Sequence, residues 1–235
     1  IALDDISIDE AAPVCTEPTT QPSNLVLIPT PTTISGTFDA AVPAVDEYLI
    51  VRSLSNTLMA TPADGTFYLP GDAIGSGNVV ISTTSTSFTD INLAPVTTYY
   101  YFVFAHYNEN CSGAPNYLQL NPLQNNSSTT ALPPCIMPPL PPTGIQLTPS
   151  NTVIIGSFTG AAGANRYLTV SSTANTLSAS PVNGTVYTAG QAFGGGTVVS
   201  YSANTSFSVT GLAVNTTYYF YIFAVNAECT GEPFY

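Results

Sequence analysis

One stretch of sequence occurs twice and decides the fold: Leu93-Ala-Pro-Val-Thr-Thr-Tyr99-Tyr-Tyr-Phe-Val-Phe-Ala105 and Leu212-Ala-Val-Asn-Thr-Thr-Tyr218-Tyr-Phe-Tyr-Ile-Phe-Ala224. Each copy passes from a turn through a polar entry into residues of aromatic and β-branched character, which is the composition of a central β-strand. Tyr99 and Tyr218 are 119 residues apart. This repeat length is about that of one β-sandwich domain and is too long for a solenoid unit.

The composition limits the class of protein. A chain of 235 residues with 44% hydrophobic content is long for one sandwich and suits two of about 115 residues each. The formal net charge of -12, with Arg52 and Arg166 as the only strong cations, excludes nucleic acid and anionic membrane surfaces as natural partners. No apolar run reaches the ~20 residues of a membrane helix, so we expect no membrane insertion. The opening Ile1-Ala-Leu-Asp is not an initiator sequence, so we expect a piece of a longer precursor.

Matching segments occur in the same order in both halves of the chain. Each half has a cysteine, a proline-rich extended segment, two short strands and then a longer strand, Tyr48–Arg52 or Tyr167–Ser171. A proline-rich run over 133–142 predicts a stiff linker, because proline fixes φ and favours extended geometry before it. We therefore predict an N-terminal extra strand or linker over 1–12, a first module over 13–134 and a second module over 135–235.

A comparison of the two copies predicts which side chains of the longer strand point inward. Leu49 and Val51 have apolar counterparts in Leu168 and Val170, whereas their neighbours change character between the copies. We therefore predict that Leu49 and Val51 face the interior of the first sandwich, and that Leu168 and Val170 face the interior of the second. The long connection that follows contains tight-turn signals and a glycine cluster. The glycines neither open a helix nor accompany a lysine, so they predict turns and no phosphate site.

The duplicated stretch resembles the fibronectin type III family. Leu93-Ala-Pro95-Val-Thr97-Thr-Tyr99 fits its Leu-x-Pro-x-Thr-x-Tyr corner, in which the tyrosine hydroxyl closes a turn onto the backbone. The second copy keeps the leucine, threonine and tyrosine and has Val214 in place of the proline. The core tryptophan common in the family is absent, and Phe38 and Phe158 occupy its place.

The whole repeat, over residues 13–235, is similar to the divergent modules arrayed in secreted surface proteins of Bacteroidetes. The resemblance implies an all-β fold of two tandem fibronectin type III/immunoglobulin-like β-sandwiches. It also implies a non-catalytic spacer or adhesive module on the cell surface or outside the cell, with no cofactor. Two alternatives stay open: an accessory region of a secreted multidomain hydrolase, and a carbohydrate-binding region that recognises glycans.

The four cysteines have nearly the same spacing in both copies. In a sandwich of this topology, the first strand begins at the same pole as the loop between the last two strands. We therefore expect Cys15 to pair with Cys111 and Cys135 to pair with Cys229, because a Cys111–Cys135 bond would have to span a domain. Such bonds indicate an oxidising compartment. Zinc is the rival explanation, but close-spaced ligand pairs are lacking and His106 is the only histidine.

The N-terminal residues have no counterpart before the second copy. Apolar residues alternate with polar ones, and the paired acids Asp4 and Asp5 interrupt the alternation, which predicts a strand with a bulge. The run over 3–8 resembles the closing strand of jelly-roll modules in large secreted bacterial proteins. Asp4 and Asp5 are weak calcium candidates, since hard cations prefer clustered carboxylates. The apolar residues are candidate interface residues: Ile1, Leu3, Ile6 and Ile8.

Outward-facing aromatic residues form the second candidate interface. If Tyr99, Tyr101 and Val103 point inward, alternation turns their neighbours outward. A row of exposed aromatic residues is unusual on a soluble monomer, so either the long connection covers them or they bind a partner. The candidates are Tyr100, Phe102, Tyr219 and Tyr221.

The second module is expected to lack its last strand. The segment over 118–132 must supply that strand in the first module, and the second copy has no equivalent after Tyr235. The open strand edge is a liability that something must fill. Further chain could fill it, or residues 1–8 of a neighbouring copy could be donated head to tail and propagate a fibre. The leading functional hypothesis is a structural module of an adhesin, stalk or filament that associates with itself or with neighbouring modules.

Overall fold

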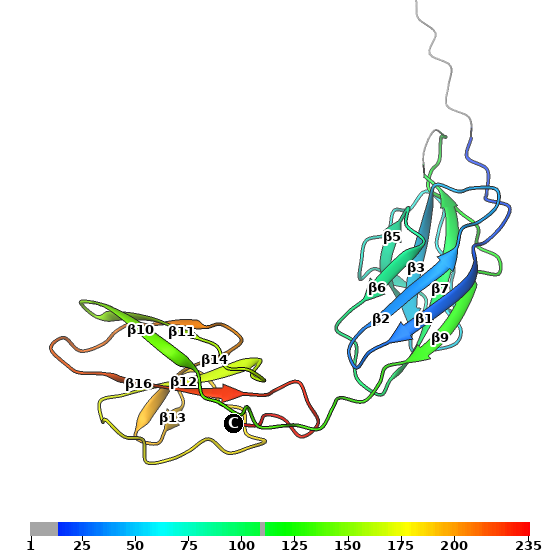
Figure 1. Cartoon of the computed structure of the whole chain (residues 1–235). Coiled ribbons are helices and arrows are strands. Elements are labelled where there is room, and N and C mark those ends of the chain that lie inside the picture. Colours follow the sequence, from blue (N-terminus) through cyan, green and yellow to red (C-terminus); the bar gives the residue numbers. More distant parts are fainter. Residues whose placement is uncertain (1–13, 109–110) are drawn as a thin grey trace, which may run out of the picture. The chain divides into compact units, whose positions relative to one another are not determined.

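The computed structural model describes residues 14–108 and 111–235 (Figure 1). The chain divides into two compact units, residues 1–131 and 132–235, called module 1 and module 2 below. The strand expected over 1–9, its apolar residues and the calcium candidates Asp4 and Asp5 lie outside the described residues.

Module 1 consists of two antiparallel sheets. The first has the order β1-β2-β6, and the second has the order β4-β5-β3-β7-β8, with β9 also paired to β7. The first, second and fifth long strands thus form one sheet, and the third, fourth, sixth and seventh form the other. This is the strand order of a fibronectin type III sandwich. The strands are β1 Ser23–Pro29, β2 Ile34–Asp39, β3 Glu47–Ser53, β4 Ala73–Ile74, β5 Gly77–Thr83, β6 Ser87–Asp90, β7 Thr98–Tyr107, β8 Asn116–Tyr117 and β9 Leu123–Ser128.

Module 2 repeats this topology with one difference. Its sheets have the orders β10-β11-β15 and β13-β14-β12-β16, so each module is a fibronectin type III-like β-sandwich, as the sequence predicts. Within the part of module 2 that the structure describes, no strand corresponds to β9. The strands are β10 Thr143–Ser150, β11 Val153–Thr159, β12 Arg166–Ser172, β13 Ala192–Phe193, β14 Gly196–Ser202, β15 Ser206–Val209 and β16 Tyr219–Val225.

The residues of β3 that face the interior of the module 1 sandwich differ from those predicted. Tyr48 and Ile50 of β3 face the interior, and the prediction that Leu49 and Val51 do so is wrong. Leu49 and Val51 are fully buried, but on the other face of the same sheet, in a second apolar cluster with Phe102. The two copies keep these positions apolar because that face is covered as well.

The long connection between β3 and β5 covers this second face. Leu58 and Ile74 of the connection pack with the sheet residues, and Tyr68 lies against them. Gly75 has φ +55°, and a Cβ there would meet the carbonyl oxygen of Leu58, so only glycine permits this approach. In module 2, Tyr187 and Phe193 cover Leu168 and Val170 in the same way. The prediction that these two residues face the interior of the second sandwich is therefore wrong as well. Each module therefore has a third layer outside its two sheets.

A turn in each connection is clamped to the loop after the second cysteine. In module 1, Gly65 N donates to Pro115 O at 2.7 Å, and Tyr117 N donates to Asp64 Oδ1 at 2.8 Å. Module 2 repeats both bonds with Gly184 and Asn183. The predicted turns thus hold the third layer in place.

Candidate interaction site

The tyrosine corner that the sequence predicts is present in both modules. Ala94 N donates to the Tyr99 hydroxyl at 3.0 Å, and Ala213 N donates to the Tyr218 hydroxyl at 3.0 Å. The corner fixes the turn from which the long strands β7 and β16 begin. Both long strands therefore begin at the same kind of corner.

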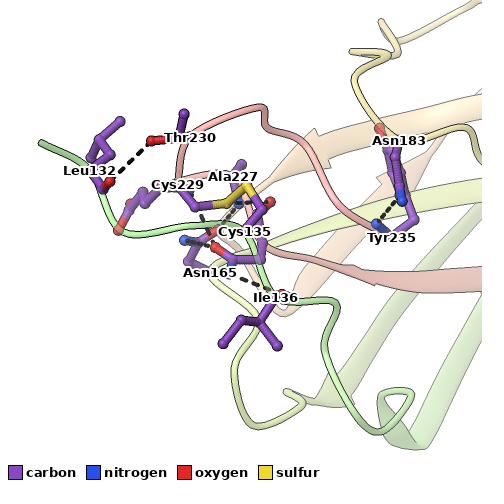
Figure 2. Close-up of a disulfide and its surroundings, with 11 residues drawn as sticks. Leu132, Cys135, Ile136, Asn165, Asn183, Ala227, Cys229, Thr230 and Tyr235 are labelled. Carbon is purple, nitrogen blue, oxygen red and sulfur yellow. Dashed lines mark hydrogen bonds between the residues drawn. A yellow bond between two sulfur atoms is a disulfide. The ribbon is translucent and has the colours of Figure 1, made fainter.

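The disulfides form one bond within each module, at the opposite end of these strands. Cys15 is bonded to Cys111 and Cys135 to Cys229, each with a Cα–Cα distance of 4.8 Å. Figure 2 shows the second bond, next to which the Thr230 hydroxyl donates to Leu132 O at 3.0 Å. The first residues of module 2 are thus held against its last loop.

In module 1, β9 closes the free edge of β7. Its residues 123–128 pair antiparallel with residues 98–103 of β7. Figure 1 shows β9 alongside β1 of the other sheet, where Asn125 Nδ2 donates to Leu25 O at 2.7 Å. The strand therefore joins the two sheets and covers the interior between them.

Thr129, directly after β9, is hydrogen-bonded to the corner at which β7 begins. Its N donates to Thr97 O at 3.0 Å, and its hydroxyl accepts from Thr97 N at 3.0 Å. The same hydroxyl donates to Ala94 O at 2.7 Å. Because Thr129 is buried, these bonds satisfy backbone groups that would otherwise lie unpaired at the corner.

In module 2, the equivalent edge of β16 is open. A single bridge, between Asn226 and Phe234, reproduces the pairing of β7 with β8. Among the described residues, Tyr219 to Ala224 pair only with β12, on the opposite side of β16. The open edge presents unpaired backbone groups along a strand, which is a template for the addition of another strand.

Side chains next to the open edge are exposed where their module 1 counterparts are buried. Leu25 of β1 is 6% exposed, whereas its counterpart Ile145 of β10 is 42% exposed. Every residue of β10 is exposed. Phe220 and Ile222 are half-buried, although their counterparts Tyr101 and Val103 are fully buried. The interior of module 2 is therefore uncovered along this side.

Two hollows lie beside the open edge, one near each end. One, of 280 Å³, includes Ala213 and Thr216, the counterparts of the residues that bind Thr129 in module 1. The other, of 200 Å³, lies against Ile222 and Ala224. None of the residues that line either hollow is charged. We call this surface the open groove: the β16 edge over 217–224, Ile145 and Leu147 of β10, Ala213 and Thr216.

The four aromatic interface candidates differ in exposure. Phe102 is buried beneath the connection, and Tyr100 and Tyr221 are half-buried. Tyr219 is 39% exposed. Tyr100 lines a pocket of 320 Å³, and the other residues that line it are Asn56, Phe102, Gln124, Asn125 and Asn126. In module 1 the connection thus covers Phe102, whereas Tyr219 of module 2 lies at the surface.

His106 lies in a polar cluster that does not have the geometry of a catalytic triad. The hydroxyl of Ser82 donates to Glu47 Oε2 at 2.9 Å and lies 3.0 Å from His106 Nε2. Glu47 and Ser82 thus approach the same ring nitrogen, and Nδ1 has no hydrogen-bonded carboxylate among the described residues. A triad needs the carboxylate on the other nitrogen, so that the histidine is oriented toward the nucleophile.

Burial and nearby carboxylates act in opposite directions on His106. Its ring is 1% exposed, and this burial lowers its pKa below the ordinary value of 6.5 because the charged form loses hydration. Glu47 and Asp46 oppose the shift. The net effect is a neutral imidazole at physiological pH.

An ion pair closes the sandwich interior of module 1 at one end. Arg52 Nη1 lies 3.0 Å from Asp90 Oδ1, and the Tyr101 hydroxyl donates to Asp90 Oδ2 at 2.9 Å. Burial, followed by the Asp90 carboxylate, raises the pKa of Tyr101. The buried carboxylate of Asp90 is thus paired with Arg52 and hydrogen-bonded by Tyr101. In the described part of the chain, no group of three or more His, Cys, Asp or Glu side chains could hold a metal ion.

Comparisons with known proteins gave matches among solved structures only. No family model and no curated protein sequence matches the chain. Among solved structures, a two-domain fibronectin type III segment of chicken tenascin aligns at 17% identity and a TM-score of 0.32, over 91% of this chain and 96% of that one. Three fibronectin type III domains of chicken CNTN1 align at 14% identity and a TM-score of 0.31, over 95% of this chain and 66% of that one. At these TM-scores, the fold assignment rests on the strand order of the chain itself.

In residues 14–108 and 111–235, no helix is long and apolar enough to cross a membrane.

Proposed function

We propose that this chain is a non-catalytic structural segment of an extracellular bacterial surface protein, and that it forms part of an adhesin, stalk or filament. The observation that carries the proposal is the open groove of module 2. A strand edge with an uncovered apolar interior beside it is a hazard in an isolated molecule. An added strand, from the chain beyond Tyr235 or from a partner, would pair with this edge and cover that interior.

The direction of the contact supports assembly into a fibre. The edge of β7 is closed by β9, whereas the corresponding edge of β16 has no strand paired with it among the described residues 219–224. A strand supplied by a neighbouring polypeptide makes a head-to-tail contact, and such a contact propagates as an open fibre where its rotation does not close a ring. The two disulfides suit this role, since they belong to an oxidising environment outside the cytosol.

Electron microscopy of the protein in its native state tests the proposal. We expect filaments or elongated stalks with a repeat of two modules. Isolated monomers on the cell surface, or a stable complex with a hydrolase domain, would contradict it. Residues 1–8 of a neighbouring copy are one proposed donor, and deletion of residues 1–9 tests them: loss of the filaments identifies the donor, and unchanged filaments exclude it.

Glycan binding is a second candidate function, supported by the pocket at Tyr100. An aromatic ring surrounded by the carboxamides of Asn56 and Gln124 offers a stacking face and uncharged hydrogen-bonding groups, as a sugar ligand requires. A glycan array distinguishes the two functions. Binding that is lost in Asn56→Ala and kept in Ile145→Asp, which alters only the open groove, would favour the glycan function.

A further inference from the structure

We propose that the two disulfides give this chain a mechanical function. They carry tension past the body of each sandwich, so that tension can pull out β8 and β9 of module 1 and no other strand that the structure describes. This mechanical function deepens the proposed function and rests on it for the source of the tension. It concerns tension that follows the covalent backbone and enters module 1 before Cys15.

Each disulfide encloses nearly a whole module. Cys15 and Cys111 are 96 residues apart, and Cys135 and Cys229 are 94 apart. The loop of module 1 contains β1 to β7, and the loop of module 2 contains β10 to β16. A pull on the chain outside a loop crosses from one cysteine to the other through the sulfur–sulfur bond. Residues inside the loop therefore add no length to a chain under tension, even when they unfold.

The entry and the exit of each loop lie side by side. Val14 and Ser112 form a parallel bridge, and Cys15 N donates to Ser112 O at 3.1 Å. Pro134 and Thr230 form the same bridge in module 2. Because the two chains run parallel, a pull before the first cysteine and after the second slides them along one another instead of peeling them apart. Backbone pairing thus reinforces each disulfide at the point where tension crosses it.

In module 1, the chain leaves the disulfide through a segment that is itself paired. β9 lies outside the loop, and its residues 123–128 pair antiparallel with residues 98–103 of β7. The C-terminal end of β9 leads to the linker, and the C-terminal end of β7 leads to Cys111. These ends point in opposite directions, so tension pulls the two strands past one another along their axes. Their hydrogen bonds are perpendicular to the strands and resist this pull together, whereas strands separated from one end lose their bonds one at a time.

Further hydrogen bonds hold this segment to the body of module 1. Before β9, Gln21 Nε2 donates to Leu118 O at 2.7 Å and to Leu120 O at 3.1 Å. Within β9, Asn125 Nδ2 donates to the backbone of β1. After β9, the Thr129 hydroxyl and N are bonded to the corner. Release of the segment therefore requires the loss of these bonds as well as the pairing of β9 with β7.

The disulfides also limit how far the chain can extend. The segment over 112–131 adds at most about 70 Å when it is released, at about 3.3–3.6 Å per extended residue. The enclosed residues would add about 310–350 Å for each module if tension reached them. A stalk or filament built from this chain thus yields slightly under tension and does not unravel.

Single-molecule stretching of the full chain, held by handles fused to its two ends, tests the path of tension. With both disulfides intact, we expect an extension step of at most about 70 Å. Reduction should lengthen the stretched chain by about 310–350 Å for each module, and Cys15→Ser with Cys111→Ser should give one such gain. The gain is read from the fully stretched length, so it is measurable even where the variant fails to fold.

Loss of stability alone should not lengthen the chain. Phe88→Ala removes a buried ring from the interior of module 1 at a position inside the loop. It should lower the melting temperature of module 1 and leave the fully stretched length unchanged. A step above about 300 Å in the oxidised chain, with or without this substitution, would overturn the mechanical function.

Two further variants test whether the β9 segment resists the tension. Asn125→Ala and Thr129→Val each remove a hydrogen bond between the segment and the body of the module. At constant force, the short step should occur at least about fivefold faster in each, because a lost hydrogen bond costs about 1 kcal/mol. Asn78→Ala is the control, since the Asn78 side chain donates to Gly71 O inside the loop, and it should leave the rate unchanged. Equal rates in all three variants would show that another part of the chain resists the tension.

These outcomes are separable from the proposed function, because stretching is measured on one chain at a time. A long step in the oxidised chain overturns the mechanical function even where electron microscopy shows filaments. Isolated monomers in electron microscopy, together with the expected stretching results, contradict the stalk or filament and support the path of tension through the disulfides.

Discussion

Val96 and Asn215 occupy the same position of the turn before the long strands β7 and β16. Both have positive φ, 52° and 55° respectively. Asparagine tolerates this left-handed conformation, whereas a β-branched residue does so at a cost of about 1–2 kcal/mol. The side chain of Val96 is 73% exposed, so no packing compensates the strain. Module 2 thus has an asparagine where module 1 has the strained Val96.

We predict that Val96→Asn stabilises module 1 by about 1 kcal/mol, because it relieves the strain and removes little buried surface. The reverse change, Asn215→Val, should destabilise module 2 by a similar amount. Chemical denaturation of the two variants measures both effects. An unchanged midpoint in both variants would show that the turn relaxes without cost.

His106 gives module 1 a dependence on pH that module 2 does not share through this position, because its counterpart there is Val225. The pKa of His106 is lowered in the folded state by burial, so the unfolded chain binds the proton more readily. Stability from this group is therefore complete above the unfolded pKa of about 6.5 and decreases as the pH falls below that value.

We predict that module 1 loses more stability between pH 7 and pH 5 than the same module with His106→Val. Residue Val225 shows that valine fits this position of the fold, where it is fully buried. Denaturation midpoints at the two pH values give the measurement, and the carboxylates common to both chains cancel in the difference. Equal losses in the two chains would assign the acid sensitivity to Asp and Glu residues alone.

At the scale of the elements, β3 shows which part of the fold the sequence predicts. The repeat predicts the strand over 48–52, and the sandwich topology predicts the pairing of the cysteines; the antiparallel pairing of β3 with β7 was not predicted. Which residues of β3 point into the sandwich could not be predicted in this way, because Leu49 and Ile50 are both fully buried, on opposite faces of the sheet. The continuous apolar run over 48–51 is itself typical of a strand covered on two sides. That signal could have predicted the third layer.

The candidate site was predictable in part. The alignment of the two copies predicts that module 2 lacks the strand corresponding to β9, since no segment matches 118–132. The hollow at Ala213 and Thr216 was not predictable, because it depends on where Thr129 reaches in module 1. Contacts between residues this far apart in sequence leave no local periodicity. The clamp of Asp64 on Tyr117 escaped prediction for the same reason.

At the scale of the whole molecule, two modules of one fold differ in how well their interiors are covered. The disulfides close loops of similar length, with sequence separations of 96 and 94, so they stabilise both modules about equally. The uncovered Ile145 and the open edge of β16 distinguish module 2. Burial of apolar surface stabilises a fold by about 25 cal/mol per Å². The apolar surface that module 2 leaves in water makes no such contribution. Module 2 should therefore be the less stable of the two.

We predict that the full chain melts in two calorimetric transitions, with module 2 unfolding at the lower temperature. Val96→Asn identifies the transitions, because it changes only module 1 and should raise the upper one by about 4–8 °C. Copying residues 118–131 after Tyr235 should raise the lower one and bring the two together. Reduction of the disulfides should lower both, since each module contains one. If Val96→Asn raised the lower transition, module 2 would be the more stable unit, and the open groove would not be the weak point of the chain.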